Sequence, residues 1–191
     1  MEKLLFETIK IKDGQVYNID WHNQRCNRTR KELFNKINLL NLKDFIDAPP
    51  KGLFRCRIVY REDILSIDYI PYSPKTIQTL KIVQSNLDYS HKYNDRTELN
   101  KLIHPNYDEI IIEKNNLLTD TSIANIAFYD GKEWLTPKIP LLQGTVREKL
   151  LHQNLLRVKN IKSSEIIHFS HFALMNAMIG FQIQKSINIK I

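Results

Sequence analysis

Two short segments carry residue types that could do chemistry on an anionic ligand. Residues 141–147 read Leu-Leu-Gln-Gly-Thr-Val-Arg, so a Gly-Thr turn opens a predicted helix. The first amides of a helix lack intrahelical acceptors and the helix dipole favours negative charge, so this turn could bind a phosphate. The Thr145 hydroxyl would add a donor. Helices also begin with Gly-Thr simply to cap the first turn, and both interpretations stay open for this segment alone.

The second segment is the run from His91 to Arg96, in which Lys92 lies between a predicted strand and a predicted helix. A lysine in such a place is usually a solvated surface residue. In a pocket, desolvation and nearby cations lower the pKa of a lysine, and the neutral amine can attack a carbonyl. His91 and Arg96 would supply the positive neighbours. A surface role and a nucleophilic role are both open for Lys92.

Hydrophobic patterns predict a mixed α/β (α+β) chain around these two segments. In the first eighty residues they predict strands at 5–12 and 15–19 joined by Asp13-Gly14, a helix from Asp20, a short helix at 42–47, and strands at 53–60 and 65–72. Pro71 and Pro74 then disfavour both helix and central strand. We therefore expect two domains, residues 1–74 and residues 75–191.

The second predicted domain alternates strands with short helices. The patterns predict strands at 80–84, 108–113, 117–120, 125–129, 134–136, 166–169 and 181–187, with helices at 97–103 and 146–156. The last helix has an apolar stripe formed by Val146, Leu150, Leu151 and Leu155.

Composition narrows the class of partner. The chain has 191 residues, with 28 Lys and Arg against 21 Asp and Glu, and a net charge of +7. The basic residues are scattered, so an anionic small ligand is favoured over nucleic acid. No apolar run approaches the ~20 residues of a membrane span, so we expect no membrane partner. Cys26 and Cys56 are expected to be buried thiols in a reducing, cytoplasmic setting, and neither has metal-ligand spacing.

Taken in order, several motifs resemble the class IV pyridoxal-phosphate enzymes, which include branched-chain and D-amino-acid aminotransferases and 4-amino-4-deoxychorismate lyase. The resemblance begins near Leu5 and covers nearly the whole sequence. Its motifs are Phe6-Glu7-Thr8, His22-Asn23-Gln24-Arg25, Lys92 with Arg96, Asp108-Glu109, residues 118–126, Thr136-Pro137 and residues 142–147.

The resemblance implies a fold, a cofactor and an assembly. The implied fold is the two-domain D-amino-acid aminotransferase-like fold of pyridoxal-phosphate fold type IV. It would be N-terminally shortened, because the chain starts at the Phe-Glu-Thr strand. Residues 75–191 would form a larger pseudo-barrel domain that carries the cofactor lysine. The implied cofactor is pyridoxal 5'-phosphate, the substrate a small anion, and the assembly a homodimer.

The resemblance also implies residue roles. Lys92 becomes the catalytic lysine that bonds to the cofactor, and Arg25 the arginine that grips its phosphate. Asp120 falls where the family usually places a glutamate beside the pyridine nitrogen. The implied cofactor-binding set is Arg25, Lys92, Asp120, Thr121, Ser122, Gly144, Thr145 and Val146, with no metal. Weaker substrate candidates are Phe6, Arg55, Arg57, His171, Phe172 and Ala173.

Within the family, two features resemble the lyases. Lys92 is followed by Arg96, and residues 172–175 read Phe-Ala-Leu-Met. We therefore expect elimination of pyruvate to give 4-aminobenzoate, a step of folate biosynthesis. An aminotransferase acting on branched-chain or D-amino acids is the alternative. A third alternative is a degenerate member without catalysis, since Asp120 is shorter than the usual glutamate and Val146 replaces a family threonine.

Overall fold

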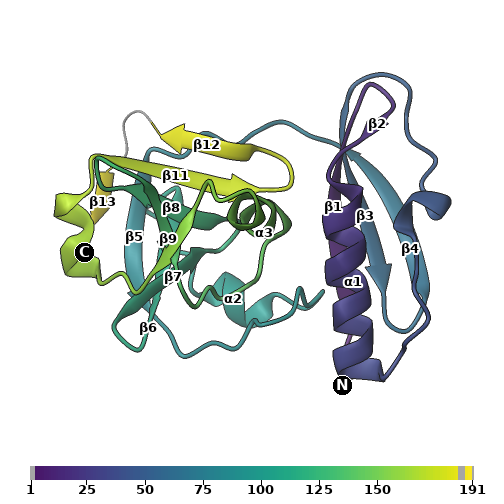
Figure 1. Cartoon of the computed structure of the whole chain (residues 1–191), viewed down its shortest axis with the longest axis horizontal. Helices are drawn as coiled ribbons and strands as arrows, with labels where there is room; N and C mark the ends of the chain where they lie inside the picture. The colour runs from purple at the N-terminus through teal and green to yellow at the C-terminus, as the bar shows by residue number, and fades with distance from the viewer. Residues whose placement is uncertain (1–2, 185–187, 191) are drawn as a thin grey trace. The chain divides into compact units, whose positions relative to one another are not determined.

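The computed structural model describes residues 3–184 and 188–190, and the chain divides into two compact units. Unit 1 comprises Met1–Pro74 with His91–Asp95, and unit 2 comprises Lys75–Ser90 with Arg96–Ile191. Figure 1 labels most of the helices and strands of each unit.

The segment His91–Asp95 corrects the predicted domain assignment, which gave Lys92 to residues 75–191. The backbone of this segment pairs with the start of β1 (Leu5–Lys12). The Phe6 N–H donates to the Lys92 carbonyl at 3.0 Å, and the Asn94 N–H donates to the Leu4 carbonyl at 2.8 Å. Because these bonds extend the sheet of unit 1, Lys92 belongs to unit 1.

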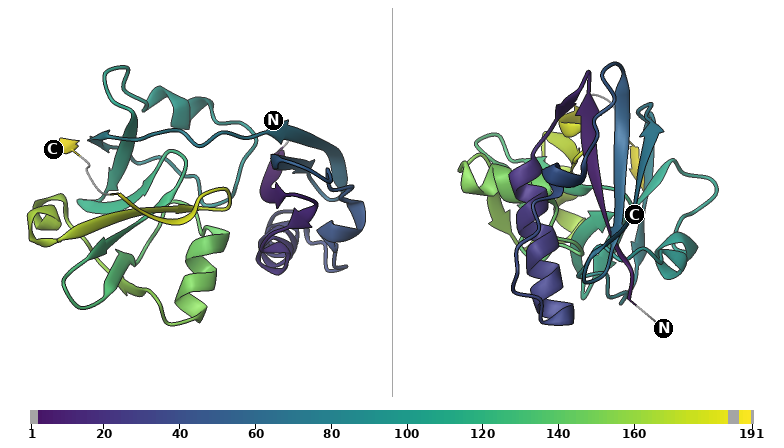
Figure 2. Two further views of the ribbon diagram at one scale, coloured as in Figure 1. Left: turned by 90° about the horizontal axis from the view of Figure 1, so that it is seen from above. Right: turned by 90° about the vertical axis from the view of Figure 1, so that its right-hand side faces the viewer.

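Unit 1 is an antiparallel sheet with one long helix. Within the described residues its strands are β1, β2 (Gln15–Val16), β3 (Leu53–Tyr60) and β4 (Ile64–Pro71), in the order β2-β1-β3-β4. Helix α1 (Ile19–Phe34) lies along one face of this sheet (Figures 1 and 2), and a short 3₁₀ helix, η1 (Leu42–Phe45), follows it. Helix α1 starts one residue before the predicted Asp20, and its N-cap residue Asn18 takes the left-handed conformation.

The alternation of β1 separates two faces of the sheet. Leu5, Ile9 and Ile11 pack in one core with Cys26 of α1. The intervening residues, Phe6 among them, point to the opposite face, where the strand register pairs Thr8 with Arg57 and Lys10 with Arg55. Both cysteines are buried, as predicted, and burial raises the pKa of each thiol to about 12.

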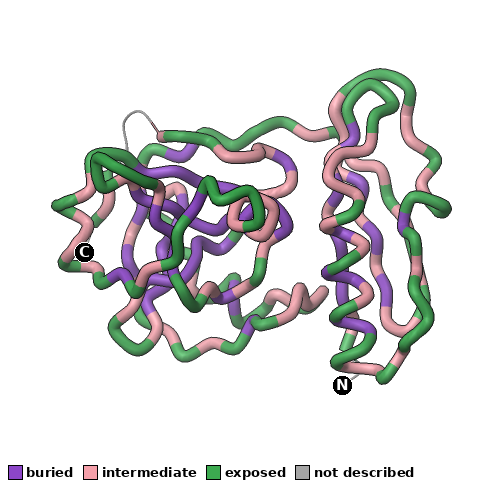
Figure 3. Tube along the Cα trace, viewed as in Figure 1, coloured by how far each residue is buried: buried purple, intermediate pink, exposed green. Residues whose placement is uncertain are grey.

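Unit 2 is built on a branched sheet. Within the described residues nine strands join, in the order β10-β9-β8-β7-β6-β5-β13, and β11 pairs with both β8 and β12. The strands are β5 (Thr79–Gln84), β6 (Glu109–Lys114), β7 (Leu117–Thr121), β8 (Asn125–Tyr129), β9 (Trp134–Pro137), β10 (Arg157–Lys159), β11 (His171–Asn176), β12 (Gly180–Gln184) and β13 (Asn188–Lys190). The central strands are the most deeply buried part of this unit (Figure 3).

Three helices accompany this sheet: α2 (Thr97–Lys101), α3 (Thr145–His152) and the 3₁₀ helix η2 (Ser163–His168). The predicted strand at 166–169 is wrong, since most of it is the end of η2. Helix α3 ends before the predicted 156, and Leu155 is exposed instead of completing an apolar stripe. Residues 185–187 of the last predicted strand lie outside the described residues. Among the described residues, no helix has the length and apolar character needed to cross a membrane.

Candidate active site

The buried charges of unit 1 centre on Glu7 of β1. Its carboxylate accepts hydrogen bonds from Arg25 Nε at 2.8 Å and Arg25 Nη2 at 2.5 Å, and it contacts His22 Nδ1 at 2.6 Å. We call these three residues the Glu7 cluster. Burial by itself would raise the pKa of Glu7, but the charge and hydrogen bonds of Arg25, with a hydrogen bond from His22, lower it to about 2. Glu7 takes two of the five N–H donors of the guanidinium, so it fixes the orientation of Arg25.

Lys92 lies on the sheet face opposite α1. Its Nζ is 4.5 Å from the centroid of the Phe6 ring, and the Arg57 guanidinium carbon is 4.6 Å from the same centroid. Arg57 Nη2 donates to Asn94 Oδ1 at 2.6 Å. Arg55 follows on the same face of β3, and its buried Nε has no hydrogen-bond partner among the described residues. Unit 1 thus brings predicted substrate candidates together with the predicted catalytic lysine.

In unit 2, the side chain of Asp120 is hydrogen-bonded to the loop that contains Leu142. Asp120 ends one strand pair with Asn125 directly opposite it. Its Oδ1 accepts a hydrogen bond from Asn125 Nδ2 at 2.7 Å, and its Oδ2 accepts one from the Leu142 N–H at 2.8 Å. Asn125 Nδ2 also donates to the Leu142 carbonyl at 2.8 Å. We call these three residues the Asp120 clamp. Burial raises the pKa of Asp120 to about 6, against the opposing effect of these hydrogen bonds.

The predicted phosphate turn follows the Asp120 clamp directly. A Cβ on Gly144 would lie 1.9 Å from Asn125 Oδ1, so glycine is required for the turn to approach the clamp. Gly144 is the N-cap of α3, and Thr145 and Val146 form its buried first turn. No side chain of the described chain caps this end, and the Thr145 hydroxyl makes no hydrogen bond within the same part of the chain. The first turn therefore keeps the donor character expected of an anion site.

Thr121 and Ser122 have structural partners. The Thr121 hydroxyl donates to the Ala124 carbonyl at 3.0 Å and accepts from the Ala124 N–H at 2.9 Å, which closes the turn between β7 and β8. The Ser122 hydroxyl donates to the buried carboxylate of Glu109 at 3.0 Å, and the Ser122 carbonyl accepts from Arg96 Nη2 at 2.7 Å. These contacts shape the connection that carries Asp120.

The three candidates on β11 differ in exposure. His171 is exposed, with its ring 5.8 Å from the ring centroid of Tyr129. Phe172 packs in the core, with its ring 5.1 Å from that of Phe128, and Ala173 is fully buried. The substrate contact predicted for Phe172 and Ala173 therefore finds almost no exposed side-chain surface.

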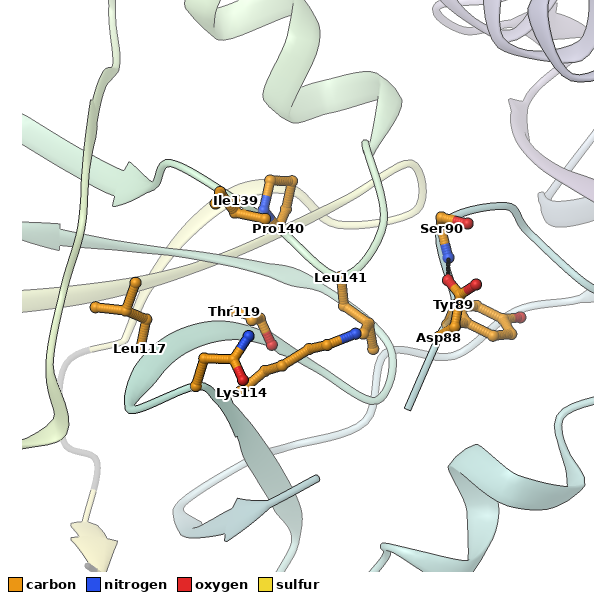
Figure 4. A pocket seen from close by; sticks show the side chains of 10 residues that line it. Asp88, Tyr89, Ser90, Lys114, Leu117, Thr119, Ile139, Pro140 and Leu141 are labelled. Carbon is orange, nitrogen blue, oxygen red and sulfur yellow. Dashed lines mark hydrogen bonds between the residues drawn. The ribbon is translucent and has the colours of Figure 1, made fainter. Parts of the chain in front are cut away.

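Unit 2 also contains a cavity of about 220 Å³ (Figure 4). Its lining combines apolar side chains with Lys114, whose Nζ donates to the Leu87 carbonyl at 2.9 Å. The lining residues are Asp88, Tyr89, Ser90, Lys114, Asn115, Leu117, Thr119, Ile139, Pro140 and Leu141. None of the sequence-predicted site residues lines this cavity, although Leu141 precedes the Leu142 amide of the Asp120 clamp.

Two residues at these sites had no role assigned from the sequence. Glu7 stood only within the Phe-Glu-Thr motif, and its partner Arg25 is 18 positions away. Asn125 stood only within the motif at 118–126, although its position five residues after Asp120 suits a pair facing each other across a tight strand connection.

The residues fit pyridoxal phosphate by the chemistry of their donors. The hydrogen bonds that Asp120 accepts come from neutral donors, and a protonated ring nitrogen would add a positive charge beside its carboxylate. A carboxylate has about four acceptor sites, and the donors of Asn125, Leu141 and Leu142 use three of those of Asp120. The Thr145 hydroxyl, the first amides of α3 and the Arg25 guanidinium are donors of the kind that bind phosphate. Lys92 supplies a primary amine.

Comparison with known proteins identifies the family. The model of the amino-transferase class IV family matches residues 4–187. The chain therefore belongs to the class IV aminotransferase family, whose members are pyridoxal-phosphate-dependent enzymes. The mixed α/β fold expected from the sequence is confirmed.

Three individual proteins show the range of similarity. An uncharacterized protein of Haemophilus influenzae is 38% identical over 184 residues, which cover 92% of this chain and 98% of that protein. The crystal structure of a provisionally assigned 4-amino-4-deoxychorismate lyase of Haemophilus somnus 129PT is 36% identical, with a TM-score of 0.85 over 94% of this chain and 98% of that one. A hypothetical aminotransferase of Mycobacterium tuberculosis in its PLP-bound form shares the fold, with 13% identity and a TM-score of 0.75 over 96% of this chain and 81% of that one.

Proposed function

We propose that this chain binds pyridoxal phosphate and acts as a 4-amino-4-deoxychorismate lyase, releasing pyruvate to leave 4-aminobenzoate in folate biosynthesis. The observation that carries this proposal is the 36% identity to the Haemophilus somnus protein provisionally assigned that activity, 98% of which is covered. The amine of Lys92, the guanidinium of Arg25 and the carboxylate of Asp120 support the cofactor part of the proposal.

Lys92, Arg25 and Asp120 have different roles in the proposed reaction. Lys92 bears the cofactor and then accepts the proton from the substrate carbon that carries the amine. Arg25, held by Glu7, is a phosphate ligand in this proposal, and the first turn of α3 offers donors of the same kind. Asp120 places negative charge beside the ring nitrogen. The cofactor, when bound, supplies an electron-accepting ring that stabilises negative charge on the substrate carbon.

Substrate recognition in this proposal uses the sheet face around Lys92. The substrate carries two carboxylates, and Arg57 and Arg55 present guanidinium groups on the face where Phe6 contacts Lys92. Carboxylates are favoured partners of such groups because the fork geometry allows paired hydrogen bonds. His171 is exposed and stays a weaker candidate.

The alternative is an aminotransferase acting on branched-chain or D-amino acids, supported by the family match and by the fold shared with the Mycobacterium tuberculosis protein. In that reaction Lys92 would take the proton from one atom and return it at another, and the amino group of the donor amino acid would end on an oxo acid. The two reactions differ in products: pyruvate and 4-aminobenzoate in the first, and an exchanged amino group in the second.

One assay separates these reactions. Purified protein loaded with pyridoxal phosphate is given 4-amino-4-deoxychorismate, and pyruvate and 4-aminobenzoate are measured together. We expect equal amounts of both products, and no products from Lys92→Ala. A parallel assay offers amino acids with 2-oxoglutarate or pyruvate. Amino transfer in the second assay without products in the first would replace the lyase by the aminotransferase. No reaction in either assay would favour a degenerate member.

The proposal also covers assembly and location. We propose a homodimer that works in the cytoplasm on a small anionic substrate, with no nucleic-acid or membrane partner. The two buried thiols, Cys26 and Cys56, suit a reducing compartment. Light scattering of the purified protein tests the dimer, and a monomer mass would contradict it.

A further inference from the structure

Asn125 makes contacts that serve two parts of the proposed cofactor site at once. Its Nδ2 carries two protons, and both are used: one bonds Asp120 Oδ1 at 2.7 Å and the other bonds the Leu142 carbonyl at 2.8 Å. The Leu142 N–H closes the arrangement by donating to Asp120 Oδ2 at 2.8 Å. The amide of Asn125 thus ties the carboxylate to the loop before the phosphate turn.

The carbonyl side of Asn125 faces that turn. The position of a Cβ on Gly144 lies 1.9 Å from Asn125 Oδ1 and 3.1 Å from Asn125 Cγ. The side chain of Asn125 therefore fits closely against the backbone of Gly144, at the N-cap of α3. A shift of Asn125 would change both the hydrogen bonds of Asp120 and the space available to the turn.

We propose that Asn125 is a positioning residue that sets Asp120 and the phosphate turn at Gly144 and Thr145 together, so that the ring-nitrogen end and the phosphate end of the cofactor site form as one arrangement. This inference rests on the proposed function, because it concerns how the chain receives pyridoxal phosphate. Asn125 acts through Asp120 and the backbone of the turn and needs no contact with the cofactor.

The charges around Asp120 make its titration a direct report on Asn125. The largest contribution of a charged group to the pKa of Asp120 comes from Arg147 of α3, which lowers it. The other contacts, Asn125 and the amides of Leu141 and Leu142, are neutral and also lower it. Replacing the amide of Asn125 by a carboxylate of the same shape removes one of these donors and adds a like charge, so the pKa of Asp120 rises.

The test uses the isosteric variant Asn125→Asp. We expect the dissociation constant for pyridoxal phosphate, measured by absorbance titration of the cofactor-free protein, to rise about tenfold or more. We also expect the carboxyl carbon resonance of Asp120, in isotopically labelled cofactor-free protein, to titrate at higher pH than in the wild type. A residue with only a general folding role would lower the unfolding midpoint without moving either quantity.

The matched control is Asn176→Asp. Asn176 also donates a side-chain hydrogen bond, to the Ile123 carbonyl at 3.2 Å, and it accepts from the N–H groups of Met178 and Ile179, but within the described residues it makes no bond to Asp120. We expect this variant to keep the affinity for pyridoxal phosphate within about twofold of the wild type. If Asn125→Asp does not fold, Asn125→Ser, which is smaller and lacks both amide donors, is measured in the same two ways.

The outcomes separate this inference from the proposed function. A wild-type protein that binds no pyridoxal phosphate contradicts the proposed function, and the Asp120 titration still tests the Asn125 contact because it needs no cofactor. If the wild type binds the cofactor and Asn125→Asp binds it equally well with an unchanged Asp120 titration, the positioning role of Asn125 is overturned.

Discussion

Glu7 in unit 1 and Asp120 in unit 2 are both buried carboxylates, but their pKa values move in opposite directions. Glu7 meets the charge of Arg25 and a hydrogen bond from His22, and its pKa falls to about 2 despite burial. Asp120 meets an asparagine amide and backbone N–H groups, and burial raises its pKa to about 6. Burial penalises the charged form in both places, so the charge of the partner decides the direction.

The difference suits two different tasks. The Glu7 cluster is balanced within the chain, because the carboxylate and the guanidinium neutralise each other at bonding distance. That balance orients Arg25 and holds it in place. The Asp120 clamp has no comparable counter-charge at bonding distance within the described residues, so a cation that arrives there gains from pairing with it. We interpret the Glu7 cluster of unit 1 as a pair of charges that neutralise each other before any ligand binds. We interpret Asp120 of unit 2 as a carboxylate that can pair with a cationic ring.

The largest expected effect comes from breaking the Glu7 cluster. Arg25→Met leaves the carboxylate of Glu7 buried without its guanidinium, which costs about 3–5 kcal/mol of unfolding free energy. Urea denaturation at pH 7 measures this loss. In the double variant Glu7→Gln with Arg25→Met no buried charge is left unpaired, and we expect more than half of the loss to be recovered. A double variant as unstable as Arg25→Met would show that shape rather than charge stabilises this cluster.

The second-largest expected effect distinguishes Asp120 from Glu7 by the pH range in which each carboxylate changes the stability of the fold. The folded pKa of Asp120 lies above its ordinary value of 3.8, so its ionisation weakens the fold as pH rises from about 4 to about 6. We expect Asp120→Asn to lack this decrease, which amounts to about 3 kcal/mol across that window. Burial also lowers the pKa of His22 below its ordinary value, but any contribution of His22 to the pH dependence cancels in the difference between wild type and variant.

Glu7 should show the opposite sign in a lower window. Its folded pKa lies below its ordinary value of 4.5, so its contribution is complete above 4.5 and is lost as pH falls toward 2. Glu7→Gln should therefore flatten the loss of stability below pH 4.5 and leave the Asp120 window unchanged. Unfolding curves between pH 2 and pH 7 test both variants, and windows that coincide for Glu7 and Asp120 would contradict the comparison.

The smallest expected effect concerns the neutral donor at the phosphate turn. Thr145→Val keeps the shape of the side chain and removes a hydroxyl that makes no hydrogen bond within the described chain. We expect about five- to tenfold weaker binding of pyridoxal phosphate, with the unfolding free energy within about 1 kcal/mol of wild type. Thr136→Val is the reverse control, because the Thr136 hydroxyl donates to the Ile126 carbonyl. It should lower stability and leave cofactor binding unchanged.

Much of the fold followed from local sequence signals. The Asp13-Gly14 turn, the alternation of β1 and β3, and the buried central strands of unit 2 were all readable from period and turn chemistry. The sequence patterns did not predict β11, because its residues Phe-Ala-Leu-Met are buried on both faces and show no alternation. The segment 166–169 was mistaken for a strand because four residues are too few to separate a 3₁₀ turn from an extended run.

The sequence predicted which residues belong to the candidate site but not which of them contact one another. Lys92, Arg25 and Asp120 could be selected from motifs, and the Gly-Thr turn from its position before a helix. The Glu7 to Arg25 pair and the membership of Lys92 in unit 1 depend on strand pairing between distant segments, which no local pattern encodes. Burial of Phe172 likewise depends on which strands flank β11.

The most direct test of the account is to find the lysine that holds the cofactor. The purified protein is mixed with pyridoxal phosphate, reduced with borohydride, digested, and the labelled peptide is mapped by mass spectrometry. We predict a single major label on Lys92, and its loss in Lys92→Ala. A label on another lysine, or a label whose yield Lys92→Ala leaves unchanged, would contradict the central claim.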